Sequence, residues 1–348
     1  MNVTINDVAK AAGVSTATIS RFFNDRSRVK EETAQIVEQV IKDLNYVPNS
    51  IARSLVIMQS NTIGILISQF NSIYWSEVHS TIHGYLSQHT KGMEVAAVNC
   101  DDTVLFYSNK SVKDKIKYLA EQRAIGVICL LRDLSDDDVN YLCNFDIPFV
   151  VVQSDSTDER ISSINIDNYT ATHEITQHML DLGHKHIVYI SGPSDAVFSH
   201  ERFEGFRDAM ISKQLYRKNM ILQGDTSVSD GYWRTKQILA SNPLLTAIIY
   251  ATDSMAFGGM RAIGEAGLRI PEDISIAGFD GMREQVEILD MLPPLTTVVQ
   301  PINSIGEKAA EIMLRKIQDK KMGLDKRYNI VLPTEFVDNG SCAPPRIR

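Results

Sequence analysis

Four side chains near the start of the chain have types and a spacing that suit contact with DNA bases. They share the polar face of one predicted helix: Thr16, Ala17, Ser20 and Arg21. An arginine can donate two hydrogen bonds to O6 and N7 of guanine, and the methyl group of a threonine or an alanine can contact the methyl group of thymine. This group therefore predicts a surface that reads base edges in the major groove.

The other residues that could do chemistry give no consistent site. His173 and His178 are five residues apart, whereas two metal ligands on one helical face need a spacing of four. The chain has neither a Gly-x-x-x-x-Gly-Lys-Ser/Thr phosphate loop nor a Gly-x-Ser-x-Gly nucleophile turn. We therefore expect no metal, no cofactor and no catalysis.

The composition excludes several classes of protein. The chain has 348 residues, of which 44% are hydrophobic. Its best apolar run, residues 124–131, is far shorter than the roughly 20 residues of a membrane span, and its first residues lack the basic and apolar regions of a secretion signal. The four cysteines have no Cys-x-x-Cys spacing, which fits a reducing compartment. We expect a cytoplasmic protein without a membrane partner.

The charge distribution limits where nucleic acid could bind. The formal net charge is −8, although the first sixty residues hold seven basic and six acidic side chains. A protein that coats nucleic acid without specificity would be basic throughout. DNA contact must therefore come from a small patch, and residues 21–30 are the one basic cluster of the first sixty residues.

Three short helices are predicted to position these side chains. Thr4 and Asp7 suit a capping box at the start of the first helix, Gly13 ends it, and Ser15 caps the second. A third helix follows, with its apolar residues on one stripe between residues 29 and 44. Two helices separated by a three-residue turn are typical of a helix-turn-helix unit. The alternative is a three-helix interaction module without a role in DNA binding.

From residue 61 the pattern changes to alternating strands and helices. Short apolar runs that predict buried parallel strands cover residues 62–68, 124–130, 149–152, 186–190, 247–250 and 274–279. Amphipathic stretches of helical length lie between them, for example residues 112–122 and 230–241. This order predicts an α/β fold with doubly wound parallel sheets. Because the region is too long for one such sheet, we expect two similar lobes.

Several motifs, in a fixed order, resemble the LacI/GalR family of bacterial transcription regulators. DVAKAAGVS at 7–15 and TISR at 18–21 resemble the family's DNA-reading headpiece, and LNYVPN at 44–49 with ARSL at 52–55 resembles its hinge helix. The likeness continues through DNY at 167–169, LGH at 182–184, SGP at 191–193, RFEGF at 202–206 and GFD at 278–280. The likeness covers nearly the whole chain.

The resemblance implies roles in DNA binding for the headpiece and the hinge. Residues at positions that meet bases or backbone in the family are Thr16, Ala17, Ser20, Arg21, Asn24, Asn49, Arg53 and Leu55. Leu55 matches the leucine that family members wedge into the minor groove, where an apolar side chain unstacks and kinks a base step. Packing within a short linker is the alternative for Leu55. A helix of about seven residues cannot nucleate alone in water, so we predict that the hinge is disordered without DNA.

The larger region resembles the periplasmic sugar-binding fold, in which a ligand lies between two lobes. The segment after the first strand is predicted to expose Phe70, Tyr74 and Trp75, and an aromatic face suits the C–H face of a sugar ring. A place in the core is the alternative for Tyr74 and Trp75. Arg202 and Asp280 match positions that grip the effector in the family. A guanidinium and a carboxylate together suit a polyol.

Two further positions bear on the effector. Asp253 is either a ligand contact or the N-cap of a helix that follows a strand. Where purine-binding relatives place an aromatic residue in the cleft, this chain has Thr226. This departure favours a carbohydrate over a nucleobase.

These observations predict a repressor that binds double-stranded DNA and responds to a small molecule. A pseudo-palindromic operator calls for a homodimer, and the Pro344-Pro345 ending excludes a coiled coil that would make tetramers. The alternatives are an activator, a solute-binding protein of the same fold, and an enzyme. The predicted parts are a headpiece at 1–46, a hinge at 47–60, a first lobe at 61–165 and 296–327, a second lobe at 166–295 and 328–341, and a tail at 342–348.

Overall fold

The computed structural model describes residues 4–24, 26–44, 61–68, 72–90, 93–99, 111–131, 134–153, 158, 160–194, 196–282 and 294–346. These residues belong to two compact units, Met1–Ser60 and Asn61–Arg348. The predicted hinge, with Asn49, Arg53 and Leu55, lies outside the described residues, as does Phe70. The disorder of the hinge without DNA therefore stays a prediction.

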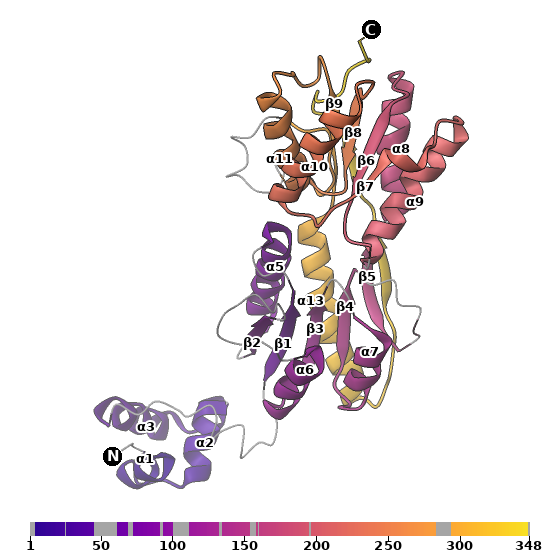
Figure 1. The fold of residues 1–348 in the computed structure, drawn as a ribbon. Coiled ribbons are helices and arrows are strands. Elements are labelled where there is room, and N and C mark those ends of the chain that lie inside the picture. Colours follow the sequence, from indigo (N-terminus) through magenta and orange to yellow (C-terminus); the bar gives the residue numbers. More distant parts are fainter. Residues whose placement is uncertain are drawn as a thin grey trace. The chain divides into compact units, whose positions relative to one another are not determined.

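The first unit contains the three predicted helices. They are α1 (Ile5–Ala11), α2 (Thr16–Asn24) and α3 (Glu31–Asp43), with a short 3₁₀ turn η1 (Arg26–Arg28) before the last (Figure 1). The predicted capping box is present, because the Thr4 amide donates to the Asp7 carboxylate at 2.9 Å. The small apolar core of the unit consists of Val8, Ala9, Ala12, Ile19 and Val37.

The first lobe of the second unit is built on a six-stranded parallel sheet with the order β11-β5-β4-β3-β1-β2. Its strands are β1 (Thr62–Ile67), β2 (Glu94–Asn99), β3 (Gly126–Leu130), β4 (Phe149–Val152), β5 (Ser162–Ile166) and β11 (Asn329–Leu332). Its helices are α5 (Ile73–His89), α6 (Val112–Glu121), α7 (Asp136–Cys143) and α13 (Ile302–Lys321).

The alternation of side chains along β1 explains why helices cover both faces of this sheet. Ile63, Ile65 and Ile67 point to one face and are buried in the cluster that includes side chains of α5 and α13. Leu66 points to the other face and is buried with side chains of α6 and α7. At Gly64 a Cβ atom would lie 2.6 Å from Leu119 of α6, so glycine permits the close approach of helix and strand.

The second lobe has a four-stranded parallel sheet with the order β7-β6-β8-β9. Its strands are β6 (Ile187–Ser191), β7 (Ile221–Gln223), β8 (Ala247–Tyr250) and β9 (Ser275–Ala277). Its helices are α8 (Asn168–Asp181), α9 (Val197–Ser212), α10 (Val228–Ser241) and α11 (Asp253–Glu265), with a 3₁₀ turn η2 (Lys218–Met220). The doubly wound α/β architecture predicted from the sequence is confirmed.

The chain passes between the lobes where strands end. β5 belongs to the first sheet and α8, which begins two residues later, to the second lobe (Figure 1). β10 (Thr297–Val299) pairs antiparallel with β12 (Glu335–Val337), and α13 then returns to the first lobe. The predicted boundary placed residues 328–341 in the second lobe, whereas β11 pairs with β5 in the first sheet. The sequence of this strand does not show which sheet it joins. Its lobe is decided by the strand with which its backbone pairs.

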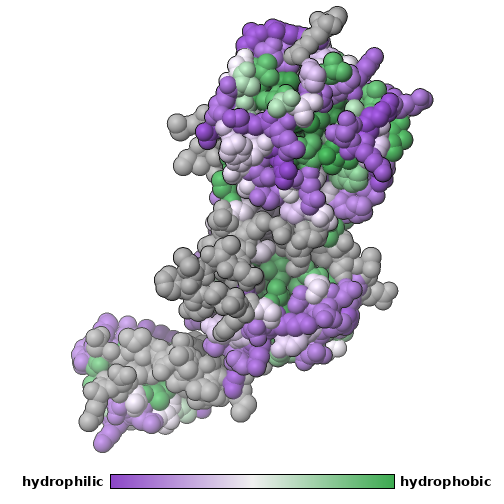
Figure 2. Space-filling model, in the orientation of Figure 1, coloured by the Kyte–Doolittle hydropathy of each residue, from purple (hydrophilic) through white to green (hydrophobic). Residues whose placement is uncertain are grey.

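Among the coloured residues in view in Figure 2, hydrophilic ones cover the larger area, and hydrophobic areas lie on both lobes of the second unit. Within the described part of the chain, no helix combines the length and the hydropathy that crossing a bilayer requires.

Candidate functional site

Three of the predicted DNA-facing residues, Thr16, Ala17 and Arg21, lie on the exposed side of α2. The hydroxyl of Ser15 accepts a hydrogen bond from the Thr18 amide at 3.2 Å, so Ser15 caps the helix as predicted. Ile19 is fully buried against the core of the unit, which fixes the rotation of the helix. Thr16, Ala17 and Arg21 are consequently exposed together. The backbone of Ser20 and Asn24 belongs to the same helix, and their side chains lie outside the described set.

Two arginines of the basic cluster have different surroundings. Arg26 is paired with Glu31 at 3.1 Å and with Glu38 at 3.0 Å, so it ties η1 to α3. Arg21 forms no ion pair with any residue that the structure describes. Of the two, only Arg26 is therefore tied to α3 by ion pairs among the described residues.

A cavity lies between the two lobes of the second unit. Its lining combines hydroxyl, amide and aromatic side chains with one pair of opposite charges. The lining residues are Ser72, Tyr74, Trp75, Gln153, Phe198, Arg202, Thr226, Thr252, Ser254, Asp280, Met282 and Gln300. Four of the residues predicted to bind an effector are thus brought together: Tyr74, Trp75, Arg202 and Asp280.

Arg202 of α9 is held on several sides at the cavity. Its side chain is 2% exposed, and its guanidinium lies 3.5 Å from the ring centre of Phe279 and 4.8 Å from that of Phe198. Its Nε donates to Oδ1 of Asn168 at 2.8 Å, and its Nη1 donates to the Ala251 carbonyl at 2.5 Å. Two rings and two acceptors therefore fix the plane of the guanidinium before any ligand enters.

Asp280 completes the charge pair at the cavity. Its Oδ1 lies 3.6 Å from Nη1 of Arg202. Burial raises the pKa of Asp280 from its ordinary 3.8 to about 6, although Arg202 and a hydrogen bond from Gln300 act in the opposite direction. Burial likewise lowers the pKa of Arg202, and Asp280 opposes that change. At neutral pH the cavity therefore presents a carboxylate that can accept and a guanidinium that can donate.

The raised pKa predicts a pH effect on stability that does not depend on any ligand. Because Asp280 binds its proton more tightly when folded, it favours the folded state below pH 4, and this contribution is lost as the pH rises from about 4 to 6. We expect the difference in unfolding free energy between the parent chain and Asp280→Asn to change across this range by up to about 3 kcal/mol. Urea titrations at several pH values measure it. Parallel pH profiles for the two chains would contradict the assignment.

Three residues link the charge pair to the first lobe. Gln300 Nε2 donates to Oδ1 of Asp280 at 2.7 Å. Its Oε1 accepts from the Tyr74 hydroxyl at 3.0 Å and from Gln153 Nε2 at 2.7 Å. Since both groups donate to Oε1, the amide of Gln300 must turn its Nε2 towards Asp280. Tyr74, Gln153 and Gln300 form the amide relay, which connects the lobes through direct hydrogen bonds.

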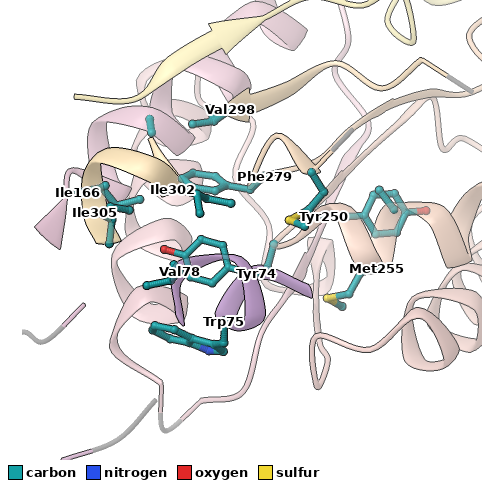
Figure 3. Close-up of a cluster of buried hydrophobic side chains, with 14 of the residues drawn as sticks. Tyr74, Trp75, Val78, Ile166, Tyr250, Met255, Phe279, Val298, Ile302 and Ile305 are labelled. Atoms are coloured by element: carbon teal, nitrogen blue, oxygen red, sulfur yellow. The ribbon is translucent and has the colours of Figure 1, made fainter. Parts of the chain in front are cut away.

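Tyr74 and Trp75 differ from their predicted setting. The sequence predicted an exposed loop, but α5 begins at Ile73, and the two side chains are 9% and 6% exposed. Both rings pack in the buried cluster that also contains Phe279 and Ile302 (Figure 3). Their ring centres are 5.1 Å apart in an edge-to-face arrangement. The two alternatives weighed for these residues, ligand contact and core, are compatible, because both rings also line the cavity.

Asp253 does not line the cavity, but its carboxylate holds a segment of the chain that does. The N-cap of α11 is Thr252, whose hydroxyl accepts from the Met255 amide, so the predicted capping role belongs to the neighbouring residue. The Asp253 carboxylate accepts from the Met282 amide at 2.8 Å and from the Thr297 hydroxyl at 2.7 Å. It thereby fixes the segment that follows Asp280.

Sequence reasoning missed Gln153, Phe198 and Gln300 at the cavity, although a signal existed for the first two. Gln153 directly follows a predicted strand, at the sheet edge where ligands bind in parallel α/β folds. Phe198 precedes Arg202 by four positions and therefore shares its helical face. Gln300 follows β10, which is too short to stand out as a strand.

Comparisons with known protein families identify both units. Residues 4–49 match the family described as bacterial regulatory proteins, lacI family. Residues 176–342 match the periplasmic binding protein-like domain.

Individual relatives match along nearly the whole chain. The HTH-type transcriptional repressor PurR of Pasteurella multocida (strain Pm70) is 32% identical over 336 residues, which cover 96% of this chain and 97% of that protein. The Lac repressor dimer bound to operator and the anti-inducer ONPF is 30% identical with a TM-score of 0.83, covering 99% of this chain and 100% of the other. The complex of the transcriptional regulator CelR with cellobiose is 25% identical with a TM-score of 0.69, covering 98% and 100%.

Proposed function

The chain belongs to the LacI family of bacterial regulatory proteins, and from this premise we propose that it is a repressor whose affinity for DNA is controlled by a small carbohydrate. It binds a pseudo-palindromic operator as a homodimer through α2, with Thr16, Ala17 and Arg21 at the base edges. Since its partner is genomic DNA, it works in the cytoplasm. The cavity has a binding role and no catalytic one.

The observation that carries the proposal for α2 is the shared exposure of three side chains on a helix whose rotation is fixed by Ile19. Arg21 is available for a bidentate contact with guanine, and the methyl groups of Thr16 and Ala17 suit contact with thymine. Ser20 and Asn24 complete the same helix, and Asn49, Arg53 and Leu55 follow in the hinge. The relatives named as repressors support this assignment.

The lining of the cavity supports a carbohydrate as the effector. Its two charges have opposite signs and neutralise each other, which suits an uncharged ligand. Asp280 can accept hydrogen bonds from ligand hydroxyls, and the rings of Trp75 and Phe198 can pack on the apolar face of a sugar. The relative solved with cellobiose is consistent with this class.

The mechanism we propose is a linkage between the lobes and the DNA. A ligand between Arg202, Asp280 and the amide relay changes the free energy of one lobe orientation relative to another. The lobe orientation of each subunit sets the separation of the two hinge segments, and DNA orders the hinges only at the right separation. Effector and operator affinities are then coupled reciprocally, typically by about 1–3 kcal/mol.

The test is selection of an operator from random duplexes of about 20 base pairs by the full-length protein. We expect a palindrome to be enriched, and its affinity to fall steeply with salt, because binding releases counterions from the phosphates. The selected duplex then serves to screen neutral sugars for those that change its affinity.

A second selection is made in the presence of the sugars, because a corepressor could be required. If neither selection enriches a sequence, the proposal for α2 is wrong, and a solute-binding role becomes the better one for the second unit. Enrichment of a sequence whose affinity responds to nucleobases but to no sugar would overturn the carbohydrate class alone.

A further inference from the structure

A second cavity of the second unit lies at the other end of the strands of the first sheet. It has a volume of about 490 Å³ and shares no lining residue with the cavity between the lobes. Phe149, the first residue of β4, lines it, whereas Gln153, which follows the last residue of the same strand, lines the cavity between the lobes. A cavity of this volume can hold a small organic molecule.

The charged part of its lining consists of five basic and three acidic side chains. Four of the basic side chains form ion pairs with carboxylates, and these pairs are Arg160–Asp158, Lys320–Asp146, Lys326–Asp319 and Arg327–Asp325. The fifth basic side chain belongs to Lys316 of α13. Among the residues that the structure describes, no carboxylate lies within ion-pair distance of Lys316.

Lys316 is also deeply buried. The residue is 7% exposed, and its Nζ donates to the carbonyl of Lys326 at 3.1 Å. Burial lowers the pKa of Lys316, and the positive charge of Arg327 acts in the same direction, whereas Asp325 and Asp319 oppose the change. Burying a charge is costly unless an opposite charge accompanies it. An anion bound in the cavity would reduce this cost.

The two carboxylates whose charge acts on Lys316 are engaged by other donors. Asp319 accepts from the Tyr328 hydroxyl at 2.7 Å and lies 3.5 Å from Nζ of Lys326. Asp325 accepts from Nη2 of Arg327 at 2.8 Å. An ammonium group has three N–H groups, and the described residues provide an acceptor for one of them. The other two suit the oxygens of a bound anion.

The rest of the lining indicates what else the ligand contains. Ile147, Phe149 and Leu324 add apolar surface to the cavity, so a ligand that fills it needs an apolar body beside its anionic group. The backbone of duplex DNA does not meet this requirement. Its phosphates lie on a wide and rigid rod, which cannot reach a lysine that is 7% exposed.

We propose that this cavity is a second ligand site, which binds a small organic anion with a phosphate or carboxylate group next to an apolar body, and that Lys316 holds the anionic group. The site is separate from the cavity between the lobes. The proposal therefore does not depend on the identity of the effector.

The test measures the Tm of the second unit in the full-length chain with four probes at constant ionic strength. Phenyl phosphate and benzoate carry an apolar ring with an anionic group, inorganic phosphate carries the anionic group alone, and phenol carries the ring alone. We expect about 10 mM phenyl phosphate or benzoate to raise the Tm by about 3 °C over chloride, because a ligand that binds the folded state stabilises it. Phenol should have no effect, and the larger of the two anionic effects identifies the head group.

Three variants locate the effect. Lys316→Met keeps most of the volume without the charge, so the rise should fall below about 1 °C, while the Tm in chloride should not decrease, since an unpaired buried charge is removed. Lys316→Arg keeps a cation that suits phosphate and carboxylate, so the rise should persist. Lys321→Met removes an exposed lysine of the same helix that is not part of the lining, and it should respond like the parent.

An equal rise in the parent and in Lys316→Met would contradict the proposal, because phosphate and similar anions also stabilise proteins without a site. The proposal is likewise wrong if neither phenyl phosphate nor benzoate raises the Tm of the parent, or if phenol raises it as much as they do. A Tm of Lys316→Met in chloride several degrees below that of the parent would assign Lys316 to anchoring the carbonyl of Lys326 instead.

Discussion

Replacing Arg202 with alanine is expected to abolish the response to the effector and to destabilise the second unit by about 3–5 kcal/mol. The guanidinium is 2% exposed, and its removal leaves the Asp280 carboxylate buried without its cation. It also leaves Asn168 Oδ1 and the Ala251 carbonyl without this donor. Binding of the selected operator should persist below the Tm of the variant, since the helices that read DNA form a unit of their own. Operator titrations with and without the sugar, together with urea unfolding, measure both effects.

A double variant separates recognition from folding. Arg202→Met with Asp280→Asn removes both charges and keeps most of the volume, so we expect much of the lost stability to return. The effector response should remain absent, because neither the guanidinium of Arg202 nor the carboxylate of Asp280 is restored. A double variant that responds to the sugar like the parent would show that the charge pair does not grip the ligand.

The second large effect is expected from Arg21→Ala. A bidentate arginine–guanine contact is worth about 1–3 kcal/mol, and a dimer makes two of them, so operator affinity should fall between about 30-fold and 10⁴-fold. The side chain is exposed, so the stability of the headpiece should change by no more than about 0.5 kcal/mol. Titration of the selected operator, with circular dichroism as a check of folding, measures the two quantities.

Arg21→Lys serves as the matched control. Lysine keeps the positive charge but lacks the planar guanidinium, so discrimination between the selected operator and a mutated operator should fall. The dependence of affinity on salt should stay nearly the same, because the charge is unchanged. An Arg21→Ala chain that binds the selected operator within twofold of the parent would show that this side chain does not read a base.

The sequence predicted those features of the fold that depend on residues close together in the chain, and it did not predict those that depend on distant pairing. The capping residues Thr4 and Ser15 were predicted correctly, because a cap depends on neighbours within one turn. The six predicted runs are buried strands, because runs such as 149–152 have no polar residue to face water, but the buried strand β5, which contains two serines and an asparagine, was not predicted. The segment that contains β11 was assigned to the second lobe, and this prediction was wrong. The strand belongs to the first sheet because it pairs with β5, which lies more than 160 residues earlier.

The cavity shows the same division. Arg202 and Asp280 were identified by resemblance, and the structure brings them within 3.6 Å of each other. Gln300 escaped notice because β10 before it is too short to stand out as a strand, whereas Gln153 was passed over although it directly follows a predicted strand. The two glutamines connect the lobes through a hydrogen bond between their amides, which lie 147 positions apart in the chain. The burial of Tyr74 was one of two alternatives left open by the sequence, because it depends on packing against residues far away in the chain, such as Phe279 and Ile302.

The way in which the chain joins the two lobes has a mechanical consequence. In the described part of the chain the backbone passes between lobes near Asp167, near Gln300 and between β11 and β12. Two bodies held by several connections at one place resist sliding, but they can rotate about that place. Gln300 lies both at a connection and in the lining of the cavity, so the cavity lies close to the place where the lobes are joined. A rotation of the lobes about this place would displace the far ends of the lobes more than it displaces the cavity.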